Sequence, residues 1–391
     1  MDKWIKVKIS DLGQVVGGAT PSTKKDEYYN GDIAWITPKD LSDFKCRYIS
    51  RGERNITKAG MDSCSTQLLP KNTVLFSSRA PIGYVAIAEN EMCTNQGFKS
   101  VIPNENIDCL FLYYLLKFNK DKIEAMGSGT TFKEVSGSTM RNIEVTIPES
   151  KNVQVRIAAI LDAIDSKIEN NIKINNNLFE QMQALYKAWF VDFEPFGGVR
   201  PSNWNDTNIY AIANIIYGAP FASKLFNTDG LGKPIIRIRD LKEQAFVTFT
   251  TEEHPKGHLI QPGDIVVGMD GEFRPYIWGN EPAWLNQRVC IFESNRPQGK
   301  AFVLYTIKPL LNKIEQTQVA TTVIHIGKKD FDAFEIILPD EATLDSFDSI
   351  TAPMIEQIVN NRLQNKRFAV LRDTLLPKLM SGELDVSDIE I

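Results

Sequence analysis

The segment Gly127-Ser-Gly-Thr-Thr-Phe-Lys133 gathers backbone N–H donors, two threonine hydroxyls and a lysine. Such a segment can hold a phosphate, with Thr130 and Thr131 donating hydrogen bonds and Lys133 adding charge. It lacks the GxxxxGK[ST] spacing of a nucleotide-binding loop, so a backbone phosphate of a polynucleotide is the better fit. A second threonine pair, Thr321-Thr322 with His325 nearby, is expected to act likewise. A plain turn is the alternative in both places.

Arginines that follow apolar runs are the next candidates for contact with a base or a phosphate. Arg79 follows Thr73-Val-Leu-Phe76 in a turn. Arginine is suited to bidentate contact with guanine in the major groove, the alternative being a solvated turn cation. Arg237 and Arg239 alternate along Ile235-Ile-Arg-Ile-Arg239, which predicts that both project from one face of a strand. Paired cations there suit phosphate or base contact, and a salt-bridged face is the alternative.

An Asn-Gln pair occurs in each half of the chain, at 95–96 and at 286–287. These amides can read adenine, although their occurrence in both halves equally suits a structural role. Lys99 and Arg288 are then the better candidates for DNA contact. The expected DNA-binding side chains are Lys39, Arg79, Gln96, Lys99, Thr130, Thr131, Lys133, Arg237, Arg239, Arg274, Asn286, Gln287, Arg288, Thr321, Thr322 and His325.

No recognisable catalytic frame accompanies these residues. The sequence has no Asn-Pro-Pro-aromatic stretch of an amino-methyltransferase and no complete GxGxxG. Asp340-Glu-Ala-Thr343 resembles a helicase box but has no phosphate-binding loop upstream. His254 and His258 are separated by Pro and Gly, which forbid the helix that would align them on a metal. We expect neither catalytic residues nor a metal site.

Composition indicates a globular protein of the cytoplasm. The chain is 43% hydrophobic without a run of 18 apolar residues, and its first residues do not read as a signal peptide. Its five cysteines form no CxxC pair, so a disulfide framework is not expected. Residues 1–150 hold 19 Lys and Arg against 18 Asp and Glu, and residues 197–340 hold 15 against 16. DNA binding would therefore need a local basic face and help from a partner.

The two halves of the chain repeat each other. A shift of 191 brings Leu69-Pro-Lys-Asn-Thr-Val-Leu-Phe76 onto Ile260-Gln-Pro-Gly-Asp-Ile-Val-Val267, and Asn95-Gln96 onto Asn286-Gln287. Near the start the shift is 200, so that Gly18-Ala19 matches Gly218-Ala219. A colinear series of this length indicates duplication of one unit.

Each half is expected to contain short β-rich runs, a closing strand that ends in Pro148 or Pro339, and then a long helix. The helices should extend from about Asn152 to Phe190 and from about Thr343 to Leu376, where Pro377 breaks or kinks the second. The expected class is α+β, with two β-rich globular domains separated by two long antiparallel helices. The expected boundaries are 1–150 and 197–340 for the β-rich domains, and 151–196 and 341–391 for the helical segments.

Apolar residues and asparagines alternate three and four apart along both helices, which predicts a heptad seam. About 39 residues make a rod of ~58 Å, longer than one domain needs, so we expect the helices to pair with each other. Packing on their own domains is the alternative. Asparagines paired across the seam would fix its register. The expected seam is Ile164, Ile168, Asn171, Asn175, Leu178, Met182, Leu185, Ile358, Asn361, Asn365, Phe368 and Leu375.

The chain resembles, over essentially its full length, the specificity (S) subunit of type I restriction–modification systems. The resemblance rests on the order and duplication of short strings beside the two helices. They are Trp35-Ile-Thr-Pro-Lys-Asp-Leu41, Gly127-Ser-Gly-Thr-Thr-Phe-Lys133, Gly268-Met-Asp-Gly-Glu-Phe-Arg-Pro-Tyr-Ile-Trp278, Trp284-Leu-Asn-Gln-Arg288, Thr321-Thr-Val-Ile-His325, Trp189-Phe-Val-Asp-Phe-Glu-Pro195 and Leu376-Pro-Lys-Leu-Met-Ser-Gly-Glu383.

The resemblance implies a non-catalytic, double-stranded DNA-binding subunit. Each of two target recognition domains would read one half of a bipartite site, and the helices would set the unread spacer. The helices would also dock two methyltransferase subunits, which restriction subunits join in the full enzyme. S-adenosylmethionine and ATP with Mg would belong to those partners, with no cofactor on this chain. A coiled-coil adaptor that binds only protein is the alternative function, and an enzyme with an unrecognised site is a third.

Overall fold

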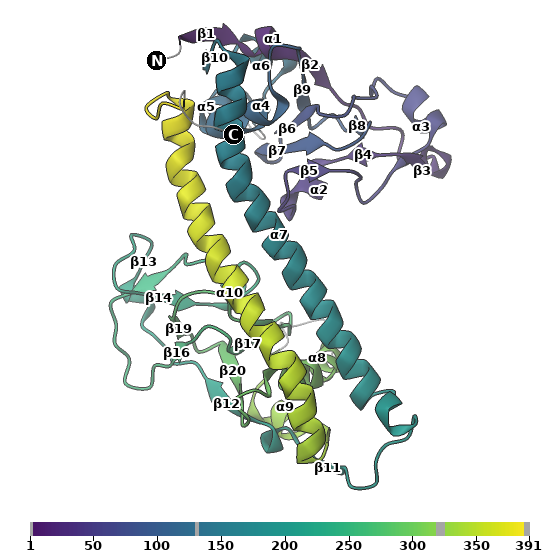
Figure 1. Cartoon of the computed structure of the whole chain (residues 1–391), viewed down its shortest axis with the longest axis vertical. Coiled ribbons are helices and arrows are strands. Elements are labelled where there is room, and N and C mark those ends of the chain that lie inside the picture. The colour runs from purple at the N-terminus through teal and green to yellow at the C-terminus, as the bar shows by residue number, and fades with distance from the viewer. Residues whose placement is uncertain (1–2, 130–132, 318–324, 387–391) are drawn as a thin grey trace. The chain divides into compact units, whose positions relative to one another are not determined.

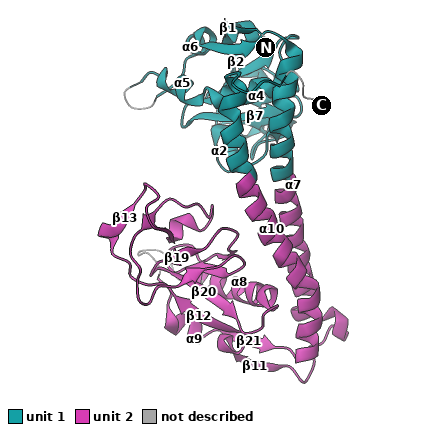
Figure 2. Ribbon diagram, turned by 60° about the vertical axis from the view of Figure 1, so that its left-hand side comes forward, with its two compact units in different colours: residues 1–169, 368–391 teal, residues 170–367 magenta. Residues whose placement is uncertain are grey.

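The computed structural model describes residues 3–129, 133–317 and 325–386. It divides into two compact units, unit 1 (residues 1–169 and 368–391) and unit 2 (residues 170–367), shown in teal and magenta in Figure 2. Both units share two 40-residue helices, α7 (Lys151–Phe190) and α10 (Glu341–Met380), each of which contributes one part to each unit (Figure 1). The predicted α+β class, with two long helices, is confirmed.

Unit 1 is built around a five-stranded sheet of order β2-β9-β6-β7-β5, with two smaller pairs, β1-β10 and β4-β8. Its strands are β1 (Trp4–Lys8), β2 (Gly13–Gly17), β3 (Tyr29–Ile33), β4 (Trp35–Ile36), β5 (Tyr48–Ile49), β6 (Val74–Ser78), β7 (Ile82–Ala88), β8 (Cys93–Thr94), β9 (Lys99–Pro103) and β10 (Glu144–Pro148). Its short helices are α1 (Ile9–Leu12), α2 (Pro38–Ser42), α3 (Lys58–Asp62), α4 (Cys109–Phe118), α5 (Lys120–Ala125) and α6 (Gly137–Asn142).

Unit 2 contains a four-stranded sheet of order β12-β20-β17-β18, a five-stranded sheet of order β13-β15-β14-β19-β16, and the pair β11-β21. Its strands are β11 (Asn205–Asn208), β12 (Ala213–Tyr217), β13 (Phe226–Asn227), β14 (Lys233–Ile236), β15 (Phe249–Thr250), β16 (Leu259–Ile260), β17 (Ile265–Gly268), β18 (Pro275–Ile277), β19 (Ala283–Leu285), β20 (Val289–Ser294) and β21 (Glu335–Leu338). Its helices are α8 (Lys300–Thr317) and α9 (Lys328–Asp332).

The sheet connections confirm the internal repeat. The strand order β2-β9-β6-β7 in unit 1 corresponds to β12-β20-β17-β18 in unit 2. The closing pair β1-β10 corresponds to β11-β21, and both pairs are antiparallel. The short pair β4-β8 corresponds to β14-β19, and both are parallel. Because β-sheet partners are far apart in sequence, shared partners are stronger evidence of duplication than shared strings of residues.

Each globular part packs its core on one end of the long helices. In unit 1 the core of the main sheet and α4 continues onto Ile157 and Leu161 of α7 and Leu379 of α10. In unit 2 it continues onto Met182 of α7 and Ile358 of α10. Both expectations for the long helices therefore hold in part. The helices pack on the globular parts and also on each other.

The second helix does not end where the sequence predicts. It passes through Pro377 and ends at Met380, whereas the sequence predicts an end near Leu376; the prediction of a break at Pro377 is therefore wrong. Proline removes one backbone hydrogen bond, which costs a few kcal/mol in a helix interior. Here it lies in the last turn, and the burial of Leu379 and Met380 in the core of unit 1 favours helical continuation.

The parts of α7 and α10 that belong to unit 2 pair through reciprocal asparagines. Asn171 donates to Asn365 at 2.8 Å, and Asn361 donates to Asn175 at 2.8 Å. The side-chain N–H of Asn175 is also bonded, since it donates to the backbone carbonyl of Ile358 at 3.4 Å. Rising residue numbers on α7 meet falling numbers on α10, so the two helices are antiparallel. The predicted seam side chains are all buried or half-buried.

In unit 1 the two helices are joined by an ion pair. Its arginine, Arg372 of α10, stands at the position that matches Met182 of α7. Arg372 of α10 donates to Asp165 of α7 at 2.8 Å, and Asp165 also accepts a hydrogen bond from Tyr114 of α4 at 2.8 Å. The Arg372 guanidinium is half-buried, and Asp165 is almost fully buried. Burial lowers the pKa of Arg372, but the interactions with Asp165 and Asp373 together outweigh it, so the net pKa is raised. This pair replaces the apolar contact that Met182 makes at the matching position.

One glycine in each unit allows a close backbone approach. Ala19 donates to the Thr94 carbonyl at 3.0 Å, and Ala219 donates to the Leu285 carbonyl at 3.1 Å. A Cβ on the preceding Gly18 would lie 2.1 Å from the Thr94 oxygen, and one on Gly218 would lie 2.0 Å from the Asn286 oxygen. These contacts bring the segment after β2 or β12 against the loop that carries the Asn-Gln pair.

We predict that Asn361→Leu lowers the free energy of unfolding by about 1–3 kcal/mol, because Asn175 then keeps a buried acceptor without its donor. The double variant Asn175→Leu/Asn361→Leu should recover most of this loss, since both polar groups are removed together. Urea unfolding measures both effects, with Asn176→Leu on the exposed face of α7 as the control. Equal stability of the single variant and the wild type would contradict the pairing.

We also predict that Gly18→Ala destabilises the fold by about 1–3 kcal/mol, because the added methyl group overlaps the Thr94 carbonyl. The adjacent Gly17→Ala is the matched control, since its Cβ would meet no atom closer than 3.9 Å. That control should change stability by no more than about 0.5 kcal/mol. Thermal unfolding compares the two variants, and similar shifts for both would show that the close approach does not matter.

Candidate nucleic-acid interface

Each unit contains a junction of three segments that the repeat relates. In unit 1, Ser78 donates to the Gly97 carbonyl at 2.7 Å, and Val135 donates to the Ser78 carbonyl at 3.0 Å. In unit 2, Met269 donates to the Arg288 carbonyl and Ile326 to the Met269 carbonyl, both at 2.9 Å. All three positions differ by 191 between the units. The end of a buried strand therefore meets the same two segments in both copies.

Charged side chains surround the junction in unit 1, which we call junction 1 (Ser78, Arg79, Gly97, Lys99 and Glu134). Arg79 and Glu134 face each other across an isolated β-bridge, with Nη1 and Oε2 3.6 Å apart. Lys99 Nζ lies 3.4 Å from Glu134 Oε1 and 3.4 Å from the Ser78 hydroxyl. Two cations share one carboxylate, so junction 1 carries a net charge of about +1. Arg79, directly after β6, and Lys99, at the start of β9, are thus brought together.

The charges are arranged differently in junction 2 (Met269, Asp270, Arg288 and His325). Asp270 faces His325 across the equivalent β-bridge, with Oδ1 2.5 Å from Nδ1 of the ring. Arg288 Nη1 lies 3.1 Å from Nδ1 of His325, and its Nε lies 3.7 Å from Asp270 Oδ2. Arg288 and His325, both predicted, therefore meet at one point. Asp270 and Glu134 were not predicted, because a carboxylate carries no sign of DNA binding by itself.

A second pair of equivalent turns follows β4 and β14. The Thr37 amide donates to Asp40 Oδ2 at 2.7 Å, and the Arg237 amide donates to Asp240 Oδ2 at 3.1 Å. The prediction that Arg237 and Arg239 lie on one strand face is wrong, since β14 ends at Ile236 and residues 238–240 form a 3-10 turn. The aspartate caps the turn and ends the strand.

The cations of these turns have different surroundings. The guanidinium of Arg237 bonds to Thr248 and lies 3.4 Å from Asp240, so the alternative of a salt-bridged residue fits it better. Arg239 is exposed. Its counterpart Lys39 is also exposed and pairs with Glu53 at 2.7 Å, a hydrogen bond that raises the pKa of the lysine. Arg239 and Lys39 therefore lie on accessible surface.

The amides divide into structural and exposed groups. The Asn95 side chain accepts a hydrogen bond from the Gly97 amide at 2.9 Å, and Asn286 is buried with its carbonyl bonded to the Val289 amide at 2.9 Å. The asparagines thus shape the loop in both copies. Gln287 is exposed, and the exposed Gln96 accepts a hydrogen bond from the Thr20 hydroxyl. Only the glutamines present their amides at the surface.

The remaining side chains predicted to contact DNA differ in their surroundings. Arg274 bonds to Glu315 at 3.0 Å and to Asn312 at 3.2 Å, and the bond to Glu315 is the main cause of its raised pKa. Lys133 is exposed beside junction 1 in the sequence. The predicted phosphate contacts Thr130, Thr131, Thr321 and Thr322 lie outside the described residues.

Buried cations attach the globular parts to the helices, and none of them was predicted from the sequence. In unit 1, Arg47 is 4% exposed and bonds to Glu169 at 2.9 Å and Ser166 at 2.8 Å, besides Asp162, all on α7. Burial lowers the pKa of Arg47, and its bonds to the carboxylates overcompensate, so that the pKa rises. A single arginine in a loop has no pattern that distinguishes it from a solvated one.

In unit 2 the attachment uses α10 instead. Lys366 donates to the Gln244 carbonyl at 3.1 Å, and Arg362 donates to the Ile277 carbonyl. Neither bond supplies a negative charge, and burial lowers the pKa of Lys366 to about 8. The two globular parts are therefore held by different interactions, although they share a fold.

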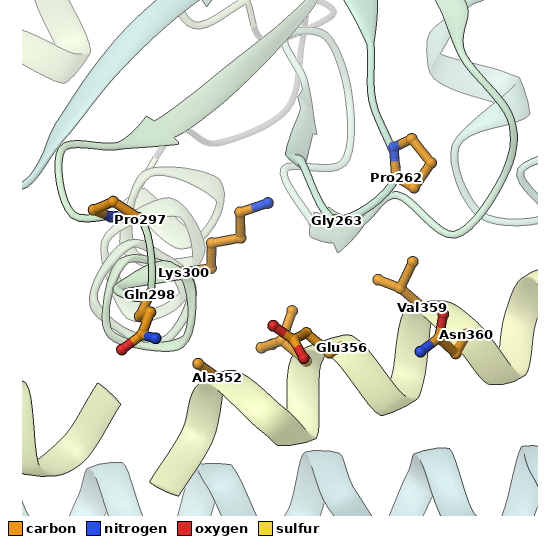
Figure 3. Close-up of a pocket in the computed structure, with 10 residues that line it drawn as sticks. Pro262, Gly263, Pro297, Gln298, Lys300, Ala352, Glu356, Val359 and Asn360 are labelled. Carbon is orange, nitrogen blue, oxygen red and sulfur yellow. The ribbon is translucent and has the colours of Figure 1, made fainter. Parts of the chain in front are cut away.

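A cavity of about 360 Å³ lies between α10 and the globular part of unit 2 (Figure 3). Lys300 extends into it from the first turn of α8, while Glu356 borders it from α10. The α10 positions Ala352, Glu356 and Val359 match the positions that hold Arg47 in unit 1. In unit 1 these helix positions bond to Arg47, whereas in unit 2 they line the cavity.

None of the helices in the described ranges has an apolar stretch that could span a lipid bilayer.

Comparisons with known proteins identify the family. The model of the type I restriction modification DNA specificity domain matches residues 1–179 and 201–368. The MjaIX specificity subunit of a type I restriction enzyme from Methanocaldococcus jannaschii is 35% identical over 409 residues, which cover 99% of this chain and 94% of that protein. The HindI specificity subunit from Haemophilus influenzae is 23% identical over 401 residues, covering 81% and 87%.

A solved structure has the same fold. The crystal structure of the type I restriction–modification S subunit from M. genitalium superposes with a TM-score of 0.60 at 19% sequence identity, covering 97% of this chain and 96% of that one. The family match extends over both repeats and the beginning of each long helix or more. This chain is therefore a member of the type I restriction–modification specificity family.

Proposed function

We propose that this chain is the DNA-recognition subunit of a type I restriction–modification complex, with each globular part reading one half of a bipartite site. The observation that carries the proposal is the pair of equivalent junctions with different side chains. A shared backbone frame with different polar groups is what two readers of unequal sequences require. Membership of the specificity family supports the same assignment.

The surroundings of the junctions suit contact with DNA. Lys99 and Arg79 in junction 1 and Arg288 in junction 2 present donors at the ends of rigid strands. Exposed Lys39 and Arg239, at equivalent turns, are suited to phosphate contact. The remaining predicted residues are assigned in the same way where they are exposed, as are Lys133, Gln96 and Gln287. Arg237 and Arg274 serve the protein structure instead, since their guanidinium groups already bond within the chain. Asn286 does so as well, because it is buried in the loop.

The long helices have two functions in this proposal. They keep the two half-sites at a fixed separation, because reciprocal asparagine pairs allow only one register. They also dock two methyltransferase subunits, which restriction subunits join in the complete enzyme. Catalysis, S-adenosylmethionine and ATP with Mg belong to those subunits. The near-neutral charge of residues 1–150 and 197–340 supports dependence on partners for tight DNA binding.

We predict that the chain, purified with its methyltransferase subunits, enriches two short motifs at one fixed gap from a library of random duplexes. Sequencing of the retained DNA is the measurement, and it should be made at several salt concentrations because backbone contacts weaken with salt. The methyltransferase subunits without this chain are the control and should enrich no motif. Failure to enrich any motif at any salt would favour the protein-binding adaptor.

We further predict that seven residues inserted at matched seam positions of α7 and α10 lengthen the gap by about three base pairs. Seven helical residues rise ~10.5 Å, and each base pair rises ~3.4 Å. Both motifs should stay unchanged, since neither junction is altered. An insertion into α7 alone is the control, and it should destroy binding because it misaligns the asparagines. Altered motifs with an unchanged gap would contradict the role of the helices.

A further inference from the structure

The two junctions hold the carboxylate on opposite sides of an equivalent β-bridge. Position 79 is arginine and position 134 is glutamate, whereas their equivalents at 270 and 325 are aspartate and histidine. The backbone hydrogen bonds of Ser78 with Gly97 and Val135 have equivalents in those of Met269 with Arg288 and Ile326, so the same three segments meet in both units. The carboxylate is at the second bridge position in junction 1, as Glu134, and at the first in junction 2, as Asp270.

A guanidinium accompanies the carboxylate in both cases, and it comes from a different segment each time. In junction 1 it belongs to Arg79, directly after β6. In junction 2 it belongs to Arg288, at the position that Gly97 occupies in unit 1. Gly97 carries no side chain, so the loop cannot supply a cation at that position in junction 1. The guanidinium therefore comes from the end of a strand in junction 1 and from the neighbouring loop in junction 2.

Both guanidinium groups keep donors for a ligand, although Nη1 of Arg288 also lies 3.1 Å from Nδ1 of His325. The closest approach to a carboxylate oxygen is 3.6 Å for Arg79 and 3.7 Å for Arg288, beyond the usual hydrogen-bond range. Their side chains are 35% and 50% exposed. Arg47 is different, because it bonds to Glu169 at 2.9 and 3.1 Å and is almost fully buried.

We propose that Arg79 and Arg288 each read a guanine, one in each half of the DNA site, and that the nearby carboxylate orients the guanidinium. Arginine binds O6 and N7 of guanine through two hydrogen bonds, and Glu134 or Asp270 limits its rotation while leaving donors for the base. Because the two arginines start from different segments of one frame, the guanine occupies a different place in each half-site. This inference rests on the proposed DNA-reading function.

The test uses the full chain with its methyltransferase subunits and the random-duplex selection, with three arginine-to-lysine variants. Lysine keeps the positive charge but cannot form the two parallel bonds. Arg79→Lys should reduce the preference for guanine at one position of one half-site by roughly ten- to hundredfold, and leave the other half-site unchanged. Arg288→Lys should do the same in the other half-site. Arg274→Lys, whose guanidinium bonds to Glu315, is the matched control and should alter neither motif.

The outcomes separate this inference from the function beneath it. If the wild-type complex enriches two motifs and both lysine variants keep them unchanged, the guanine assignment is overturned and the DNA-reading function stands. Equal weakening of both half-sites by either variant would also overturn it, since that is the behaviour of a phosphate contact. If the wild-type complex enriches no motif, the proposed function itself fails.

Discussion

Reciprocal hydrogen bonding between buried asparagines is the constraint on which the arrangement of the helices depends. Asn171 pairs with Asn365 and Asn175 with Asn361, and a shift of 190 residues converts the first pair into the second. The repeat therefore exchanges the two pairs, as expected for duplicated helices that pair in antiparallel fashion. Sliding one helix past the other by a turn would leave buried amides against apolar side chains, at a cost of about 1–3 kcal/mol for each unsatisfied group. Apolar seams tolerate such a slip more easily, so the asparagines exchange some stability for a single register.

The rest of the molecule separates a constant frame from variable side chains. Both units share the four-strand order of β2-β9-β6-β7 and β12-β20-β17-β18. They also share the close glycine contacts at Gly18 and Gly218 and the aspartate caps at Asp40 and Asp240. The residues that face outward from this frame differ, most clearly at the two junctions. Attachment to the helices differs as well, through Arg47 in unit 1 and through Arg362 and Lys366 in unit 2. Duplication explains this pattern, because the backbone contacts preserve the fold while the exposed positions are free to change.

Periodicity and repetition made much of the fold predictable. The heptad spacing predicted α7 and most of α10, and the short β-rich runs expected in each half are present as strands such as β6, β7 and β17. Helix α4 was not predicted, because its uniformly apolar sequence Cys109–Phe118 has no helical period, and Pro309 obscures α8. The continuation through Pro377 and the turn at Arg237 depend on tertiary packing and on one aspartate cap. Candidate cations could be selected from sequence, but their carboxylate partners could not, since Glu134 and Asp270 meet them only after folding.

Disulfide trapping across the helices tests the fixed register most directly. All five native cysteines are free and can be replaced, and two new cysteines are then placed on the seam. Mild oxidation should link Asn171→Cys with Asn365→Cys, and Asn175→Cys with Asn361→Cys, within one chain. The crossed combination of Asn171→Cys with Asn361→Cys is displaced by a helical turn, ~6 Å, and should keep its thiols. Equal linking of the crossed and aligned pairs, or links only between separate chains, would contradict an antiparallel seam held in one register.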